Sequence, residues 1–326
     1  MPGTFVESPS GSGMFYAPDG YGVEDPAGSG LYAFSEYTPP IDVDTASPDQ
    51  VYAALGDLVF DGRPDEFGVV WSLQSFDGWG ATSSTRQTVQ RPRQSGGWSG
   101  DGYATGRSVA LGGIVEAPDA AALRAALDRL NGACSLGDTR LVITEGTVSR
   151  WCTVHRSGAP LWNWLTPTIA QWSIQVASDD WRKFGEDVTG ATYLPQSIGG
   201  FTFPLTFPLT IDATTVSGQV HLTNPGNEVG PVRLRIDGPV VGPVVTHIGS
   251  GQSLVFSSSL ALGAGEYLDI DMEAHTVLAN GQASRSGWVT SRGWFSFEPG
   301  ENTFAFTAAQ FSAGAQLTVT ATPSYQ

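Results

Sequence analysis

Three carboxylates, Asp269, Asp271 and Glu273, form the densest acidic cluster in this sequence that could do chemistry. Alternate residues of a strand share one face, so these side chains would stand about 7 Å apart along it. Such a row could hold Ca²⁺, or two of its members could act as the acid and base of a hydrolase. The residues between them are apolar, as a core requires, so we interpret the acids as the solvated face of a strand.

The other reactive side chains form no motif. The four histidines, His155, His221, His247 and His275, lie far apart beside strand-like residues, without a second His or Cys at metal-ligand spacing. No Gly-x-Ser-x-Gly elbow, His-Glu-x-x-His helix or Walker A loop occurs. We therefore expect structural histidines, and no catalytic, metal-binding or cofactor-binding residues.

Arginine and tryptophan are concentrated in one part of the chain. Arg86, Arg91, Arg93 and Arg107 surround a Gly-rich stretch at 94–102, and eight of the ten tryptophans lie between 71 and 181. This mixture could stack on nucleic acid, but the surrounding protein is neutral to acidic, which weakens electrostatic capture. Aromatic residues and Arg are enriched at protein interfaces. We therefore favour contact between subunits over specific nucleic-acid binding.

Charge divides the chain unevenly. The 326 residues carry 16 Lys and Arg against 32 Asp and Glu, a net charge of −16, and ten of the acids lie in residues 1–62, which have no Lys or Arg. A protein that binds phosphate backbones normally has the opposite sign. The N-terminus lacks a basic, apolar leader, and no run reaches the roughly 18 apolar residues of a membrane span. We expect a soluble protein without a signal peptide.

Most of the secondary structure that the sequence predicts is β-strand. Short runs of branched and aromatic residues between Gly, Asp and Pro predict strands, among them 58–60, 69–76, 108–115, 139–144, 148–154, 169–176, 232–236 and 268–272. Only 119–130 has a helical period, with Asp119 as its N-cap and Gly132 as a left-handed stop. Cys134 and Cys152 are expected to be reduced and buried.

Composition indicates three parts. Residues 1–54 form an acidic extension rich in Gly, Pro and aromatics, either an arm whose aromatics dock on a neighbouring subunit or a poorly ordered tail. Residues 55–197 contain the helix and most of the tryptophans. Residues 198–326 have many short alternating runs, which predict a two-sheet sandwich or jelly roll.

The order and spacing of these segments resemble the distal tail proteins of long-tailed bacteriophages over roughly residues 55–326. In the first half the resemblance lies in 76–80 (FDGWG), 93–97 (RQSGG), 106–115 (GRSVALGGIV), the helix 119–130 and 177–181 (ASDDW). In the second half it lies in 224–227 (NPGN), 232–239 (VRLRIDGP), 268–271 (LDID), 280–281 (NG) and 294–302 (WFSFEPGEN).

The resemblance implies a mainly β protein: a tail-tube-like β-barrel or sandwich with one flanking helix, followed by a galectin-like β-sandwich. It implies a non-enzymatic virion protein of the tail tip, made in the bacterial cytoplasm, whose six copies form a ring around the DNA channel. Its partners would be other copies of itself, the tail tube protein and the hub or tail-associated protein, with the tape measure and receptor-binding proteins as further candidates. The extension at 1–54 departs from the family pattern.

Two other functions stay open at this point. An exposed Trp288 or Trp294 on a sandwich could stack on a sugar ring, which would make the chain a carbohydrate-binding module or a receptor-binding tail protein. Paired carboxylates at Asp269 and Asp271 could instead serve a glycan-degrading tail enzyme.

Overall fold

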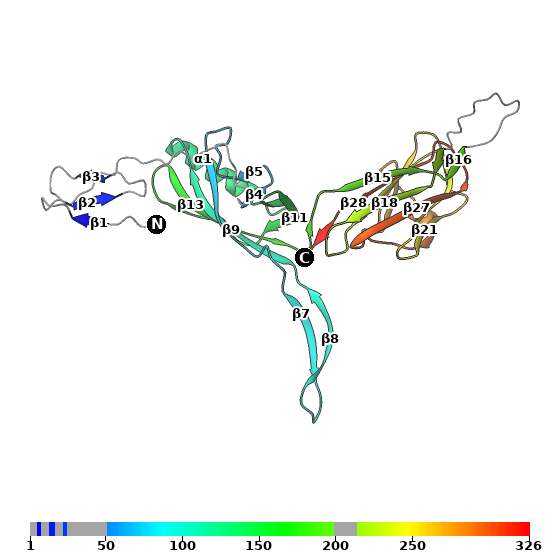
Figure 1. Cartoon of the computed structure of the whole chain (residues 1–326), viewed down its shortest axis with the longest axis horizontal. Coiled ribbons are helices and arrows are strands. Elements are labelled where there is room, and N and C mark those ends of the chain that lie inside the picture. Colours follow the sequence, from blue (N-terminus) through cyan, green and yellow to red (C-terminus); the bar gives the residue numbers. More distant parts are fainter. Residues whose placement is uncertain (1–4, 8–12, 17–21, 25–50, 199–213) are drawn as a thin grey trace. The chain divides into compact units, whose positions relative to one another are not determined.

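The computed structural model describes residues 5–7, 13–16, 22–24, 51–198 and 214–326. Residues 1–46 and 47–326 form separate units. In the first unit, strands β1 (Phe5–Glu7), β2 (Gly13–Tyr16) and β3 (Gly22–Glu24) make a three-stranded antiparallel sheet. Apart from these strands and residues 51–54, the extension at 1–54 lies outside the described residues, so the prediction of a docking arm or a poorly ordered tail stays untested. The second unit contains two sheet systems (Figure 1).

The first system is a curled sheet of ten strands with the path β5-β4-β10-β11-β13-β9-β6, in which β12 also pairs with β13 and β14 pairs with β11 and β29. Its strands are β4 (Val51–Leu55), β5 (Leu58–Phe60), β6 (Val70–Asp77), β9 (Arg107–Glu116), β10 (Thr139–Glu145), β11 (Val148–Arg156), β12 (Leu161–Trp164), β13 (Ile169–Ser178), β14 (Lys183–Phe184) and β29 (Ser324–Tyr325). The Gly62 amide donates to the Trp71 carbonyl at 2.8 Å, which draws the two ends of the path together. We call residues 51–184 the curled-sheet domain.

Strict alternation in the sequence explains how this sheet builds its core. In β13, Ala170, Trp172, Ile174 and Val176 are buried, while the residues between them are exposed or half-buried. Trp172 stacks on Phe60 with ring centroids 4.5 Å apart. Aromatic rings of this size supply much of the apolar area that the domain buries.

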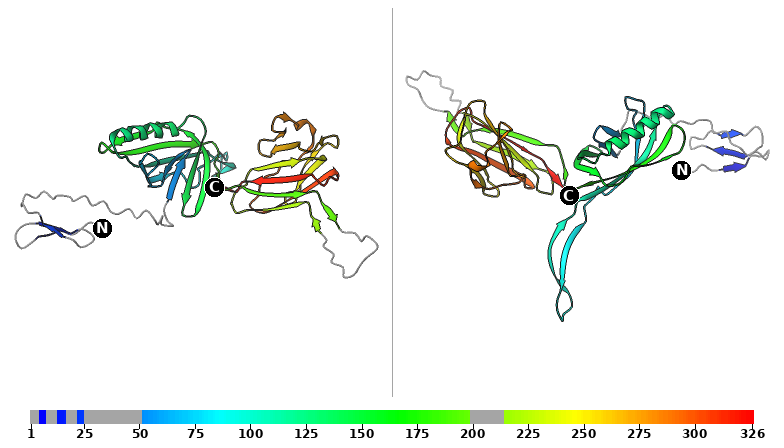
Figure 2. Two further views of the ribbon diagram at one scale, coloured as in Figure 1. Left: turned by 90° about the horizontal axis from the view of Figure 1, so that it is seen from above. Right: turned by 180° about the vertical axis from the view of Figure 1, so that it is seen from behind.

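One helix, α1 (Ala120–Ala133), packs across one face of the sheet (Figure 2). As predicted, the Asp119 side chain caps it by accepting hydrogen bonds from the amides of Ala121 and Ala122, both at 2.8 Å. The predicted stop at Gly132 is wrong: the helix runs on to Ala133, and Cys134 is its C-cap. The reason is burial, because Cys134 belongs to the core and the helix must continue to place it there.

The second system is a sandwich of two six-stranded antiparallel sheets, with the paths β15-β28-β19-β23-β24-β25 and β18-β27-β20-β21-β26, and with β22 on β20. We call residues 188–321 the sandwich domain. The first sheet consists of β15 (Val188–Tyr193), β19 (Val232–Asp237), β23 (Tyr267–Asp271), β24 (Thr276–Ala279), β25 (Ala283–Ser284) and β28 (Gln316–Ala321). The second consists of β18 (Gln219–Asn224), β20 (Val240–His247), β21 (Gln252–Phe256), β22 (Ala261–Leu262), β26 (Val289–Arg292) and β27 (Gly300–Gln310). A pair of strands, β16 (Gln196–Ile198) and β17 (Thr214–Val216), and a short helix, η1 (Ser286–Trp288), complete it.

The prediction of a mainly β protein with one α-helix is thus confirmed for the described residues. The expected domain limits at 54/55 and 197/198 remain proposals, and the strand pairing refines both of them. β4 starts at Val51 and pairs with β10, inside the curled sheet, whereas β15 starts at Val188 and pairs with β28, inside the sandwich.

Candidate assembly interface

A long hairpin without a core is the most unusual feature of the curled-sheet domain. Strands β7 (Ser84–Gln90) and β8 (Gly97–Ala104) form a sheet of their own between β6 and β9 and extend away from the domain (Figure 1). Every residue of β7, and all of β8 except half-buried Gly97, is exposed. Isolated two-stranded hairpins are marginal in water, so this one needs a surface to pack against.

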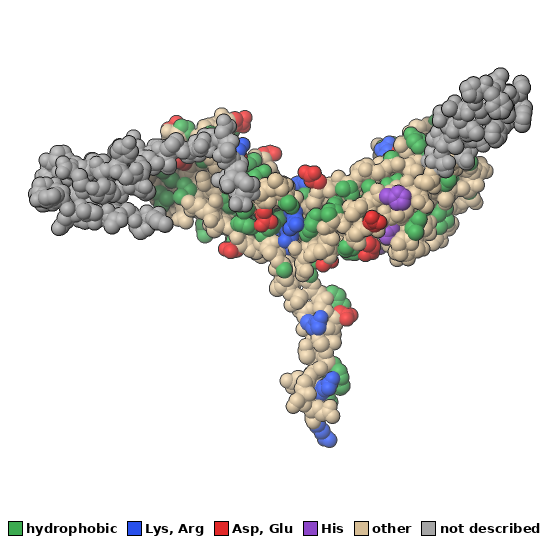
Figure 3. All heavy atoms as spheres, viewed as in Figure 1, with side chains coloured by type: hydrophobic (Ala, Val, Ile, Leu, Met, Phe, Trp, Pro, Cys, Tyr) green, Lys and Arg blue, Asp and Glu red, His purple; other side chains and the backbone are tan. Residues whose placement is uncertain are grey.

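One face of the hairpin is apolar. The register pairs Thr85 with Tyr103 and Val89 with Trp98, and residues 85 and 89 of β7 share a face. Val89, Trp98 and Tyr103 therefore point the same way, with exposed fractions of 64%, 57% and 70%. The space-filling view shows apolar and basic side chains along this hairpin (Figure 3).

The tip of the hairpin is basic. Arg91 lies over the Trp98 ring at 5.8 Å, and Arg93 occupies the left-handed region with φ 63° in the turn. The amide of Arg91 donates to the carbonyl of Gly96 at 3.1 Å and closes the turn. Among the described residues, none of the ion pairs involves Arg86, Arg91 or Arg93. The tip thus offers cations and aromatic rings together, as protein interfaces do.

Arg107 departs from this group. Sequence proximity placed it with the interface arginines, but its side chain is buried, with 1% exposed. Its guanidinium donates to the carbonyls of Gly78, Trp79 and Gly80 at one root of the hairpin, and to the carbonyl of Trp181 at 2.9 Å. The interface prediction is wrong for this residue. Arg107 holds the two roots of the hairpin to the segment that leads to the sandwich domain.

A second buried cation shares this site. The Lys183 ammonium donates to the Trp79 carbonyl at 3.0 Å, and burial, with Arg107 and Arg150 nearby, lowers the pKa of Lys183 to about 8. Burial also lowers the pKa of Arg107. Trp79 lies between them, with its ring 5.5 Å from the Arg107 guanidinium carbon and 5.6 Å from the Lys183 nitrogen.

The cysteines lie in the core of the same domain. Cys134 and Cys152 are free and buried, as predicted. Burial raises the pKa of the Cys134 thiol to about 11 and that of Cys152 to about 12. Thiols of this kind are inert, because the thiolate is the reactive form.

At the other end of the sheet, a short strand exposes large apolar side chains. β12 pairs on one side with β13, and its residues Leu161, Trp162 and Trp164, with Leu165 after it, are 66%, 41%, 43% and 52% exposed. Just before β12, Leu136, Arg156 and residues 157–159 line an open hollow of about 280 Å³. Exposed apolar patches of this kind mark interaction sites.

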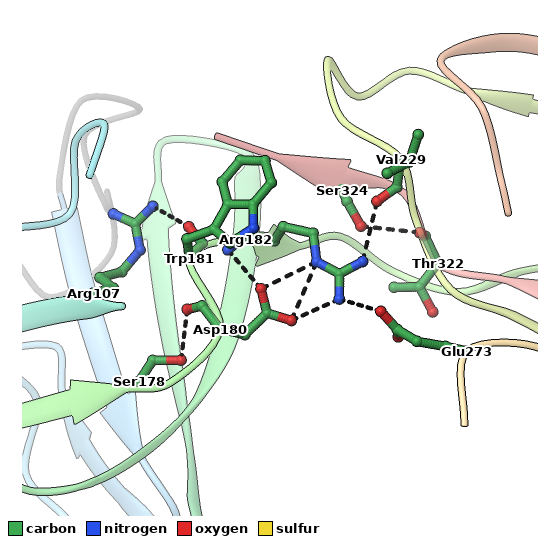
Figure 4. Close-up of polar contacts among 9 residues, drawn as sticks. All are labelled: Arg107, Ser178, Asp180, Trp181, Arg182, Val229, Glu273, Thr322 and Ser324. Atoms are coloured by element: carbon green, nitrogen blue, oxygen red, sulfur yellow. Dashed lines mark hydrogen bonds and ion pairs between the residues drawn. The ribbon is translucent and has the colours of Figure 1, made fainter. Parts of the chain in front are cut away.

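Asp180, Arg182 and Glu273 connect the curled sheet to the sandwich (Figure 4). Arg182 forms ion pairs with Asp180 at 2.7 Å and with Glu273 at 2.5 Å, and donates to the Val229 carbonyl at 3.2 Å. These carboxylates raise the pKa of Arg182 despite its partial burial. Beside this contact, β29 from the end of the chain pairs with β14.

Of the three acidic candidates Asp269, Asp271 and Glu273, the last two form hydrogen bonds and ion pairs with neighbouring residues. Asp271 accepts from the amides of Glu273 and Ala274 at 3.0 and 2.8 Å, and its carboxylate lies 3.6 Å from Arg233. Glu273 pairs with Arg182, as described above. No cluster of His, Cys, Asp and Glu that could hold a metal ion occurs within the described ranges. The structure thus places Asp269 and Asp271 on the outer face of β23, opposite the buried Leu268 and Ile270. The prediction that Glu273 shares this strand face is wrong, because β23 ends at Asp271 and Glu273 lies in the turn that follows.

The structure also gives the surroundings of the tryptophans that could stack on a sugar and of the buried histidine His247. Trp294 is half-buried and stacks on His275 at 4.7 Å, whereas Trp288 in η1 is 40% exposed. His247 is buried between Phe295 and Phe304, with hydrogen bonds to Ser250 at 2.8 Å and Asn302 at 3.1 Å. His247 is therefore structural, as expected. None of the helices in the described ranges is long and apolar enough to cross a membrane.

The sequence of the sandwich domain matches a known family. Residues 226–325 fit the model described as "Siphovirus-type tail component, C-terminal domain". This region is similar to siphovirus-type tail components. No curated protein matches the chain.

Solved structures extend the likeness from the tail component domain to the fold of most of the chain. The SPP1 Dit (gp 19.1) protein, described as a paradigm of the hub adsorption apparatus in phages that infect Gram-positive bacteria, matches with a TM-score of 0.60 at 12% identity, over 85% of this chain and 100% of its own. A chain of the phage P2 baseplate, in its activated conformation with Ca, matches with a TM-score of 0.50 at 11% identity, over 83% and 98%. The predicted resemblance to distal tail proteins is confirmed, in the sequence of residues 226–325 and in the fold of most of the chain.

Proposed function

We propose that this chain is a non-enzymatic structural subunit of a phage tail tip, and that six copies close into a ring around the path of the DNA. The ring joins the tail tube on one side to the hub or tail-associated protein on the other. The tape measure and receptor-binding proteins are further candidate partners. The relatives come from hub and baseplate assemblies, which supports this role.

The hairpin β7–β8 is the observation that carries the proposal. A closed ring needs two unlike surfaces on each subunit, because every copy contacts its neighbours head to tail. The hairpin supplies one such surface, since Val89, Trp98 and Tyr103 share an apolar face. None of residues 84–104 belongs to either hydrophobic core, so the hairpin contributes little to the folding of its own chain.

The net charge of −16 agrees with a DNA passage. A channel that DNA must traverse should not retain phosphates, and an acidic protein repels them.

The test is to replace residues 84–104 with Asn-Gly, a two-residue turn that suits the hairpin roots. Native mass spectrometry of the wild-type chain over a concentration series should show a closed oligomer, and the shortened variant should remain monomeric with a nearly unchanged melting temperature. A wild-type ring that persists without the hairpin would show that another surface closes it. A wild-type chain that never associates would contradict self-assembly in solution.

A further inference from the structure

Among the residues that the structure describes, nothing packs over the exposed side chains of the aromatic strand β12, which lies at the opposite end of the curled sheet from the hairpin. We propose that the aromatic surface of β12, made of Trp162 and Trp164 on one face of the strand, is the receptor for the β7–β8 hairpin of a second copy of this chain. This inference rests on the proposed ring and names the surface that receives the hairpin.

The register of the sheet separates the two surfaces. β9 pairs with β13 from Arg107 and Ser178 at the hairpin end to Glu116 and Ile169 at the other end. Nine residue steps of a strand span about 30 Å. β12 runs toward the far end, where Trp164 pairs with Ala170, while the hairpin extends beyond the near end. A hairpin cannot therefore reach β12 of its own chain, and contact between them must join two copies.

The two surfaces also match in chemistry. The hairpin brings exposed Trp98 and Tyr103 on one face, and Arg91 and Arg93 at its tip. The receptor offers two indole rings to the guanidinium groups, an arrangement that this fold uses repeatedly. Among the described residues, Arg129 lies over Phe67 at 4.4 Å and Arg140 over Trp151 at 4.1 Å.

Shape and charge favour the same pairing. The hollow of about 280 Å³ lies beside Gln175, between the positions where β11 and β12 pair with β13, and offers a concave site for a side chain of the hairpin at the near edge of this surface. Glu116, exposed at the same end of the sheet as Trp164, has no ion pair among those of the described residues and is available to an arginine of the tip. An apolar centre with charged groups at its rim is the usual composition of a protein interface.

The first experiment compares oligomers of the wild-type chain with those of the double variant Trp162→Ser/Trp164→Ser. Trp288→Ser is the matched control, because Trp288 is 40% exposed against 41% and 43% for the two receptor tryptophans. We expect the double variant to require at least a tenfold higher concentration for assembly, and the control to assemble like the wild type. Melting curves of all three should coincide, since the three side chains are exposed.

The second experiment captures the contact directly. The two native cysteines are buried, so introduced cysteines are the reactive ones. Chains with Arg93→Cys are mixed with chains with Trp164→Cys under mild oxidation, and separately with chains carrying Phe311→Cys, a site on the sandwich that is 60% exposed. We expect heterodimeric disulfides with the Trp164→Cys chains and at least tenfold fewer with the control.

The outcomes separate the two proposals. Wild-type rings whose assembly is insensitive to Trp162→Ser/Trp164→Ser, without selective cross-links, would overturn the β12 receptor and leave the ring intact. Absence of both wild-type association and selective cross-links would count against both. Selective cross-links together with a weakened ring would support both.

Discussion

The curled-sheet domain and the sandwich domain solve the same problem, a buried β core, in different ways. The sandwich closes on itself: its sheets alternate regularly, and Asp237 and Asp271 on its surface lie beside Arg235 and Arg233. The curled-sheet domain, in contrast, exposes large apolar side chains and buries charged ones. It exposes the hairpin and the β12 tryptophans. It also buries two cations, Arg107 and Lys183, whose hydrogen bonds go to backbone carbonyls and not to carboxylates, although burying a charge costs solvation free energy.

This difference indicates where assembly takes place. A domain that exposes large aromatics, and that fixes its protruding hairpin with buried hydrogen bonds, has a surface suited to contact with another protein. A domain that satisfies its own groups can be carried at the periphery of an assembly, where its loops face other partners.

The largest effect is expected from Leu127→Asp in α1. Leu127 is 3% exposed, so the substitution buries an unpaired charge in the core of the curled sheet and should cost several kcal/mol, about 3–5. Calorimetry combined with hydrogen exchange should show loss of protection in the curled-sheet domain and retained protection in the sandwich.

The control for this variant is Arg124→Asp on the exposed side of the same helix, which should change the free energy of unfolding by about 0.5 kcal/mol or less. An unchanged melting temperature for Leu127→Asp would refute the packing of α1 on the sheet.

The next effect concerns Arg107. Arg107→Met removes a cation that donates to four carbonyls and leaves those acceptors buried, which should cost about 2–4 kcal/mol. Its counterpart in the sandwich is Arg233→Ala, whose side chain is 76% exposed and 3.6 Å from Asp271, with an expected change of about 0.5 kcal/mol or less. Chemical denaturation measures both, and equal losses would contradict the contrast between the domains.

The sequence predicted much of this fold because most of its signals are local. Alternation over 169–176 and leucine spacing over 119–130 depend only on neighbouring residues, and both elements form as expected. The hairpin was not predicted as a pair of strands, because three of the eight residues of β8 are glycines and few of the others favour strands, so its conformation depends on pairing with β7.

The residues assigned to an interface show which contacts local sequence patterns cannot predict. Arg107 was grouped with its neighbours in the sequence, but its partners lie 27 to 74 residues away, at Gly80 and Trp181, and no local pattern reports such distances. The tryptophan excess at 71–181 predicted an interface, and the interface remains a proposal. It could not separate Trp71 and Trp172, which form the core, from Trp98, Trp162 and Trp164, which are exposed.

Alkaline pH should affect the curled-sheet domain first. The pKa of Lys183 is about 8 in the folded chain against 10.5 when exposed, so the unfolded state binds more protons between these values and stability rises with pH, by at most about 1.4 kcal/mol per pH unit. Above pH 9 the two buried thiols oppose this gain, because their folded pKa values of about 11 and 12 make the unfolded state lose protons first. Stability of the domain should therefore increase from pH 8 to 9 and level off or decline above it. Lys183→Met should abolish the increase, and an increase that survives this substitution would assign it to another group.

Acidic pH should act on the sandwich. Burial lowers the pKa of His247, so its contribution to stability is present above pH 6.5 and is lost as the pH falls through the lowered value. Hydrogen exchange at pH 7 and pH 5 should show a loss of protection around β20 and β27 that His247→Gln suppresses. Equal loss in the curled sheet would show that the acid response is not local to His247.

The smallest effect is expected at the contact between the two domains. Glu273→Gln removes one of the two carboxylates that pair with Arg182, but Glu273 is 51% exposed and Asp180 remains bound to the guanidinium, so the cost should be about 0.5 kcal/mol. Arg182→Met removes the donor to Asp180, to Glu273 and to the Val229 carbonyl at once, and should cost more than Glu273→Gln. The sum of the single changes should exceed that of the double variant Arg182→Met/Glu273→Gln, because Glu273 has already lost its partner. Additive changes would mean that the ion pair between Arg182 and Glu273 contributes no stability of its own to the contact between the domains.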